Sequence, residues 1–224
     1  MIIKIVIAVL LSPLLVLAGE PISPLFGVGQ ESVELGLSDI HADKKQIKYR
    51  PNMTGISRLA LTAYGLTLGA SFRGTEDLNR DYGTTTFSDY QVGYHNHKWG
   101  IDAVYQVYKG FYTTETNQTQ LFPDLRLQQY VILGRIALEE ADFTVGALLD
   151  QSDEIKKTSG KYYFVGGLRQ HVMDNNISLL QQDYAGKNND LEALRKMKVT
   201  SLNLGVGAGK YWVSDNKFFV GALL

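Results

Sequence analysis

Acidic and amide side chains recur at alternating positions in two neighbouring segments of the sequence. They are Asp89 and Gln91 within residues 84–95, and Asp102 and Gln106 within residues 98–112. Because successive side chains of a β-strand point to opposite faces, each pair projects to one side of its segment. Carboxylates placed in this way could form ion pairs, line a ligand or ion path, or act together in catalysis.

Two arginines supply the opposite charge. Arg58 and Arg73 lie on the hairpin that precedes these segments. A buried carboxylate without a partner costs several kcal/mol, so we expect Asp89 and Asp102 to pair with Arg58 or Arg73. A polar network that maintains the shape of the protein is the favoured interpretation. A ligand or ion path and a catalytic carboxylate pair are the alternatives.

The histidines and a glycine-rich stretch do not predict a catalytic or metal site. His95 and His97 flank a short turn and are expected to be solvated, while His41 and His171 have no obvious partners. A stable zinc site needs three or four ligands, and a membrane lipid hydrolase needs a serine beside its histidine. The stretch "GVGAGK" (205–210) alternates along one strand and lacks the strand–loop–helix context of a phosphate loop. We predict no catalytic residue, no metal and no cofactor.

Alternation of apolar and polar residues with a period of two predicts an all-β fold. Helical periodicity appears only at 188–198, in a short amphipathic stretch. The predicted strands cover residues 32–38, 44–51, 54–63, 66–73, 84–95, 98–112, 125–138, 142–150, 160–170, 177–184, 199–212 and 217–224.

Short turns and long polar loops alternate along the chain, which is typical of an antiparallel up-and-down transmembrane β-barrel. Tight turns are predicted at 64–65, 96–97, 139–140 and 214–216, and long loops at 74–83, 113–124 and 151–159. The strands at 84–95 and 98–112 exceed the 5 to 6 residues usual in soluble sheets. We predict a barrel of about 10–12 strands, with a soluble β-sandwich as the alternative.

Parity divides the segment 98–112 between lipid and lumen. Its aliphatic and aromatic positions are expected to face lipid, and its acid and amide positions a polar lumen. The residues expected at the lipid interfaces are Trp99, Tyr108, Lys109 and Tyr112. Lys109 is expected to extend its ammonium group to the outer interface, towards lipopolysaccharide phosphates.

Residues 1–18 have the pattern of a secretory signal peptide. Lys4 precedes an apolar run from Ile5 to Leu17, and Val16-Leu17-Ala18 suits a signal-peptidase site. The run is shorter than the roughly 20 residues of a membrane-spanning helix, which argues against an uncleaved anchor. We predict a cleaved signal at 1–18, a barrel domain at 19–224 and a location in the cell outer membrane.

Composition excludes several classes of partner and site. The formal net charge is -1, and no basic stripe or nucleic-acid motif is present, so nucleic acid is not an expected partner. The absence of cysteine excludes disulfides and thiolate metal sites. The expected partners are outer-membrane lipids, lipopolysaccharide and the barrel-assembly machinery; a small-molecule ligand is not identified.

Three motifs carry a family likeness: "YRPN" (49–52), "YGTTTFSDYQ" (82–91) and "WGIDAVYQVYKGFY" (99–112). They resemble the bacterial family known as domain of unknown function 4421, whose members look like outer-membrane β-barrels. The likeness covers roughly residues 44–112 and is thinner further along. It implies a barrel and no activity, because none is attached to the family. Family members are usually longer, and Leu224 is not the aromatic residue that tends to end such barrels, so we expect a truncated chain.

The sequence therefore predicts an outer-membrane β-barrel that serves as a structural protein, a narrow pore or a ligand-binding barrel. The alternatives are an outer-membrane lipid-modifying hydrolase and a soluble secreted β-sheet protein. The residue pattern favours no particular reaction.

Overall fold

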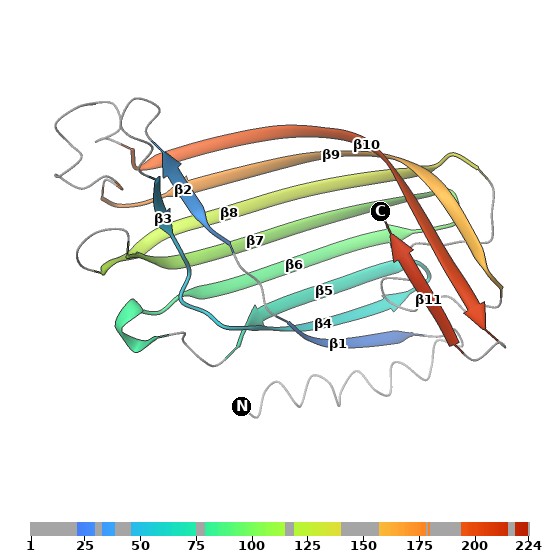
Figure 1. The fold of residues 1–224 in the computed structure, drawn as a ribbon, viewed down its shortest axis with the longest axis horizontal. Coiled ribbons are helices and arrows are strands. Elements are labelled where there is room, and N and C mark those ends of the chain that lie inside the picture. The colour runs from blue at the N-terminus through green and yellow to red at the C-terminus, as the bar shows by residue number, and fades with distance from the viewer. Residues whose placement is uncertain are drawn as a thin grey trace.

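Antiparallel β-strands make up most of the described chain (Figure 1). The computed structural model describes residues 22–29, 33–38, 46–74, 79–114, 119–139, 157–177, 179, 194–214 and 218–223. The strands are β1 (Ser23–Gly29), β2 (Leu35–Ser38), β3 (Gln46–Tyr49), β4 (Ile56–Ala63), β5 (Leu66–Arg73), β6 (Thr86–His95), β7 (Trp99–Thr113), β8 (Gln120–Ala137), β9 (Ser159–Asp174), β10 (Lys196–Ser214) and β11 (Phe218–Leu223). The prediction of an all-β antiparallel fold is confirmed.

Nine strands form one sheet in the order β1-β4-β5-β6-β7-β8-β9-β10-β11, and β2 pairs with β3 in a second sheet. The main sheet is not closed into a barrel, because β1 and β11 lie at its two edges. The described strands therefore confirm the antiparallel sheet but not the expected closure into a barrel of about 10–12 strands. Two of the predicted strands leave the main sheet because they pair with each other.

Most predicted strands are present within a few residues of their expected bounds, and β5 matches residue for residue. Strand β1 was not predicted. The helical periodicity at 188–198 does not give a helix at its described end, because Lys196 begins β10 and pairs with Asp174 of β9. Strand pairing there overrides a weak helical pattern.

The sequence also predicted strands at 142–150 and 177–184, but no described strand lies between β8 and β9 or between β9 and β10 in the main sheet. Residues 142–150 lie outside the described residues, as does most of 177–184, in which the described Ile177 and Leu179 are not in a strand. Strand β8 pairs directly with β9, and β9 pairs directly with β10. The long connection after β8 therefore lies at the same end of the sheet as the tight turn at Tyr64 and Gly65, which breaks the expected alternation of short and long loops.

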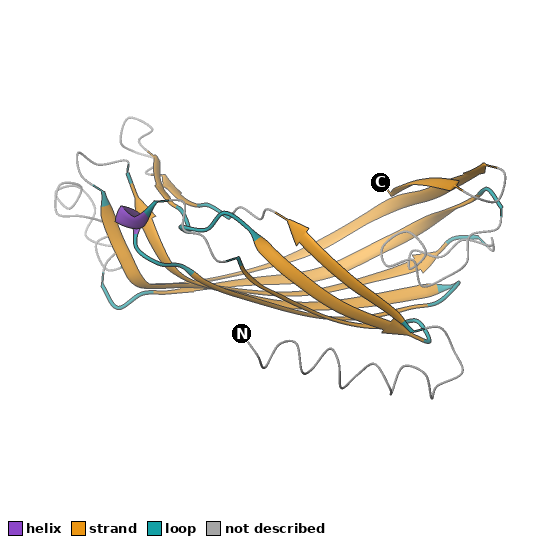
Figure 2. Cartoon of the chain, turned by 90° about the horizontal axis from the view of Figure 1, so that it is seen from below, coloured by secondary structure: helices purple, strands orange, loops and turns teal. Residues whose placement is uncertain are grey.

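The hairpin β2–β3 lies across one end of the bowed main sheet, on its concave side (Figures 1 and 2). Tyr49 of β3 is fully buried there, and its ring meets Phe122 edge-on at a centroid distance of 5.1 Å. The buried apolar side chains of this end cluster are Ile47, Tyr49, Met53, Phe87, Tyr108, Phe111, Phe122, Leu125, Leu127, Met173 and Leu179. The core of the protein thus fills one end of the concave face.

Asn52 forms hydrogen bonds that join the segment after β3 to the loop between β5 and β6. Its side-chain amide donates to the carbonyls of Asn79 and Gly83, and its side-chain oxygen accepts from the Asn79 amide at 3.1 Å. Its backbone amide donates to Thr85 Oγ1 at 2.7 Å. The short 3-10 helix η1 (Arg80–Tyr82) lies in this loop. Within the described ranges, no helix is long and apolar enough to cross a membrane.

Candidate functional site

The convex face of the main sheet carries exposed apolar side chains in continuous rows. One row contains Val92, Ala103, Ile132, Leu168 and Leu202, which pair in register across β6 to β10. Four neighbouring rows of this kind pass through Thr200, Leu202, Leu204 and Val206 of β10, one row through each residue. We call these four rows together the apolar band. On β10, Leu204 and Val206 are 67% and 79% exposed. No charged residue occupies a described position of the apolar band on β4 to β10.

Aromatic side chains border the apolar band. Tyr90, Tyr105 and Tyr130 share the row nearest the β2–β3 hairpin, and the rings of Tyr105 and Tyr130 stack at a centroid distance of 4.8 Å. At the opposite margin the rings of Tyr94 and Trp99 lie 5.0 Å apart. Tyrosine and tryptophan concentrate where a membrane meets water, because their rings have an apolar body and a polar tip.

Along the middle of the sheet, the charged side chains lie on the concave face. At the described strand positions of this face there are five cationic side chains and two carboxylates, a surplus of three positive charges. They are Arg58, Arg73, Arg135, Lys161 and Arg169, with Asp89 and Asp102. The six polar lumen residues predicted from the sequence, Arg58, Arg73, Asp89, Gln91, Asp102 and Gln106, all lie on this side of the sheet.

Asp102 of β7 is the centre of one charged cluster. Its Oδ1 lies 2.9 Å from Nε2 of His95, and its Oδ2 accepts a hydrogen bond from Arg135 of β8. The side chains of His95 and Arg135 are 8% and 11% exposed, so water screens the cluster only weakly. From the sequence, Asp102 was expected to pair with Arg58 or Arg73. Arg135 takes that place because it stands one strand away on the same face.

Two glycines make room for this cluster. A β-carbon at Gly93 would lie 2.7 Å from Asp102 Oδ1, and one at Gly100 would lie 2.5 Å from His95 Nδ1. Gly93 pairs with Asp102, and Gly100 pairs with His95. The absent side chains leave the space in which the imidazole and the carboxylate meet.

Arg58 and Asp89 belong to a second cluster, in which a glutamine stands between them. Arg58 donates to Gln91 Oε1, and Gln91 Nε2 donates to Asp89 Oδ2 at 2.8 Å. Ser71 also donates to Asp89 Oδ2, at 3.2 Å. The expected ion pair of Asp89 with Arg58 is therefore replaced by a relay through Gln91, because β5 separates the strands that carry the two charges.

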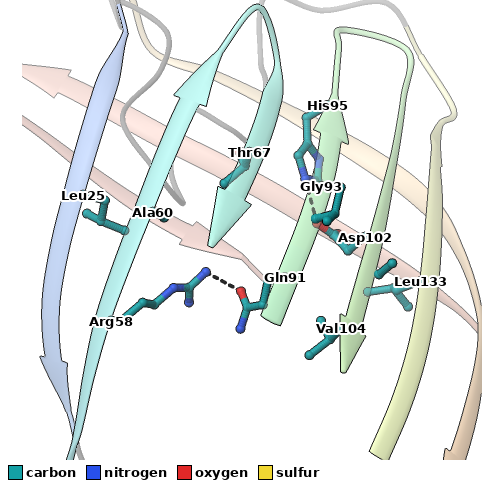
Figure 3. Close-up of a pocket in the computed structure, with 12 residues that line it drawn as sticks. Leu25, Arg58, Ala60, Thr67, Gln91, Gly93, His95, Asp102, Val104 and Leu133 are labelled. Atoms are coloured by element: carbon teal, nitrogen blue, oxygen red, sulfur yellow. Dashed lines mark hydrogen bonds and ion pairs between the residues drawn. The ribbon is translucent and has the colours of Figure 1, made fainter. Parts of the chain in front are cut away.

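A cavity of about 300 Å³ lies between the two clusters on the concave face (Figure 3). Arg58 and Gln91 line one side, and His95 and Asp102 line the other. Its remaining side-chain walls come from Thr67 and from the apolar residues Leu25, Ala60, Val104 and Leu133. The cavity thus combines hydrogen-bonding groups with apolar walls, as small-molecule sites do.

The histidine of the cavity was misjudged from the sequence. His95 was expected to be solvated at a turn, but it is the last residue of β6 and faces the concave side. His97 is exposed in the turn, His171 lies on the concave face of β9, and His41 lies outside the described residues. No group of three or more potential metal ligands occurs among the described residues. Nε2 of His95 is engaged by Asp102, and its Nδ1 is buried without a hydrogen-bond partner in the described part of the chain.

The four residues expected at the lipid interfaces fall into two groups. Trp99 and Lys109 are exposed on the convex face, where Lys109 Nζ lies 3.5 Å from Asp124 Oδ1. Tyr108 and Tyr112 are buried instead, Tyr108 in the end cluster and Tyr112 against the ring of Tyr82. Tyr108 precedes the β-bulge between Lys109 and Phe111 and points to the concave face, where its ring packs on Phe87, whereas the bulge shifts the register of Tyr112. The prediction of an interfacial Tyr108 and Tyr112 is corrected.

Two features of the site were not predicted from the sequence, the position of Arg135 and the contact of Tyr105 with Tyr130. Arg135 alternates with Ile132, Gly134 and Ile136, so it could have been assigned to the polar face of β8. Tyr105 and Tyr130 could have been recognised as a pair only from the register between β7 and β8. The register between paired strands determines which side chains are neighbours, and a single sequence does not determine that register.

The comparison with protein families gives one match, which spans residues 27–223. The matching family is described as a domain of unknown function (DUF4421). The chain belongs to the DUF4421 family. The match extends well beyond residues 44–112, where the motifs lie. No curated protein and no solved structure matches the chain.

Proposed function

We propose that this DUF4421 protein is an outer-membrane protein whose sheet crosses the lipid as the wall of a β-barrel around a polar lumen. The apolar band with aromatic residues at both margins carries the proposal. Along β10 the uncharged stretch from Thr200 to Ala208 rises about 27 Å at 3.4 Å per residue. A transmembrane β-strand tilted by about 45° needs about 9–11 residues to cross the lipid, and Thr200 to Ala208 supplies nine.

The opposite arrangement is expected of a soluble β-sandwich. There the face with the large apolar side chains would be covered, and the charged face would meet water. In this chain Leu202, Leu204 and Val206 are exposed while Asp89 is 2% exposed. Lipid as the outer solvent accounts for both observations. The outer-membrane lipids would contact the apolar band, and the barrel-assembly machinery would insert the sheet.

Membrane insertion also requires partners for the two edges of the sheet. An unpaired strand edge in lipid exposes amide and carbonyl groups, each at a cost of several kcal/mol. The proposal therefore includes closure of the wall, in which β1 and β11 pair with one another or with further strands.

The end cluster supports a lumen that is blocked at one end. Its side chains come from β3, β6, β7, β8 and β9, and Arg50 and Tyr112 exchange backbone hydrogen bonds of 2.9 and 3.0 Å. The lumen would then open at the end of the tight turns, and the protein would be a binding or structural barrel instead of a through-pore. Purified protein in planar lipid bilayers is expected to give no steady conductance, and a stable open channel would contradict the blocked end.

The location is tested by separating inner and outer membranes on a sucrose gradient and running the protein on gels with and without boiling. We expect it in the outer-membrane fraction, with an unheated band that migrates differently from the boiled one. Release in the soluble periplasmic fraction, or a migration that does not change with heat, would contradict the proposal.

A further inference from the structure

We infer that the cavity beside Arg58 binds a small carboxylate with an apolar body. This inference rests on the proposed function, because the cavity is sheltered from bulk water only where the wall encloses a lumen. The ligand's carboxylate would contact the Arg58 guanidinium, and its body would lie against Leu25 and Ala60, which pair in register on β1 and β4.

The guanidinium of Arg58 has hydrogen-bond donors that no described residue accepts from. Among the described residues its guanidinium donates only to the neutral amide oxygen of Gln91, and its Nε is buried without a hydrogen-bond partner. No described carboxylate lies within ion-pair distance of Arg58. Because Nε is buried, a carboxylate would reach the terminal guanidinium nitrogens, whose N–H groups not used by Gln91 can form a bidentate pair.

The surrounding charges favour an anion. Asp102, the one carboxylate that lines the cavity, is already paired with Arg135 and hydrogen-bonded to His95. Asp89 does not line the cavity, and it accepts hydrogen bonds from Gln91 and from Ser71. With both of these acids engaged, Arg58 is a cation beside the cavity that no described carboxylate neutralises, and its charge attracts an anion.

The size and the walls of the cavity narrow the class of ligand. A volume of about 300 Å³ is at the lower end of the range for small-molecule sites. The aliphatic side chains that lie among the polar groups of the lining provide no hydrogen bonds, so they suit a compact hydrocarbon or aromatic body. Inorganic anions would contact Arg58 without using these walls.

The probe 4-fluorobenzoate tests this inference by fluorine NMR on the purified full chain in detergent micelles. We expect saturable broadening of the probe signal with the unmodified protein. The variant Arg58→Gln should bind at least about tenfold more weakly. Arg169→Gln removes a positive charge from the same face but away from the cavity, and it should stay within about twofold of the unmodified protein. Acetate should compete more weakly than benzoate, because it lacks the apolar body.

A second variant keeps the test decisive if Arg58→Gln does not fold. Ala60→Leu adds volume to the cavity wall and leaves every charge in place, so it should also abolish broadening. Absence of saturable binding to the unmodified protein, equal binding by Ala60→Leu, or equal loss in Arg58→Gln and Arg169→Gln would overturn the inference. Heat-dependent migration on gels shows separately whether each variant forms a barrel. A variant that forms the barrel but does not bind the probe tests the site alone, whereas absence of heat-dependent migration in the unmodified protein contradicts the proposed function.

Discussion

Nε2 of His95 lies 2.9 Å from Oδ1 of Asp102, although the two residues stand on different strands and are not paired in register. Each pairs with a glycine, His95 with Gly100 and Asp102 with Gly93. The contact therefore runs diagonally between β6 and β7, over positions that carry no side chain. Backbone register, and not sequence proximity, sets the geometry of this cluster.

The first prediction concerns the space beneath His95. Gly100→Ala places a β-carbon 2.5 Å from Nδ1 of His95, so the imidazole must move away from Asp102. We expect the free energy of unfolding to fall by about 1–3 kcal/mol, as for other overpacked sites. Gly205→Ala is the matched control, because Gly205 lies in the same cross-strand row and a β-carbon there meets nothing within 4 Å. Denaturant midpoints in detergent measure both, and equal values would contradict the geometry.

The second prediction concerns the ion pair of Asp102 and Arg135. Asp102→Asn leaves the 11%-exposed Arg135 side chain without its carboxylate, and we expect a loss of about 2 kcal/mol of stability. Arg135→Gln should cost a similar amount. The double variant should lose less than the sum of the two, with a coupling of about 1 kcal/mol or more. Additive losses in the same denaturation assay would show that the two residues do not interact.

The third prediction concerns Tyr49, whose phenol donates to the Leu179 carbonyl within the end cluster. Burial raises the pKa of Tyr49 to about 12. The unfolded chain loses this proton near pH 10, so the stability that Tyr49 contributes is present below pH 10 and is lost as the pH rises from about 10 to 12.

Tyr49→Phe tests that dependence. The variant lacks the hydrogen bond, so we expect it to be about 1 kcal/mol less stable at pH 8. The difference from the unmodified protein should shrink towards pH 12, because only the unmodified protein loses stability through this group. Denaturant midpoints at a series of alkaline pH values measure the two curves; curves that stay parallel would contradict the burial of the phenol.

The fourth prediction places a charge on either face of β10. Leu204→Arg puts a guanidinium in the apolar band, where lipid exposure costs about 2–4 kcal/mol near the middle of the bilayer. Asn203→Arg, one residue earlier, points to the concave side and should be tolerated. We expect folding into lipid vesicles, followed by heat-dependent migration on gels, to fail or slow only for Leu204→Arg. Equal folding of the two variants would argue against a lipid-facing band.

Alternation predicted much of this fold because the faces of the sheet differ so strongly. On β10, Leu202, Leu204 and Val206 alternate with Asn203 and Gly205, and one pattern fixes both the strand and its exposed face. The placement of Asp89 and Asp102 on the concave side followed from the same parity. In these strands local sequence and tertiary environment agree.

Parity failed where the backbone departs from a regular strand. Gly110 has a φ of 90°, and its bulge turns Phe111 from the expected lipid side into the end cluster. The hairpin of β2 and β3 alternates like its neighbours, yet it leaves the sheet and packs on it. Partners of charged residues also depend on strand order, so Arg135 could not be chosen over Arg58 for Asp102 from the sequence alone.

The proposed contact of the convex face with lipid is measured most directly by spin labels on β10. The chain has no cysteine, so single cysteines at Ser201, Leu202, Asn203, Leu204, Gly205 and Val206 can each carry one label without background. In lipid vesicles, collision with oxygen reports lipid exposure, and collision with a water-soluble nickel chelate reports exposure to the lumen. We predict strict alternation, with high oxygen accessibility at Leu202, Leu204 and Val206 and high nickel accessibility at the three positions between them. High nickel accessibility at all six positions would contradict a membrane-spanning sheet.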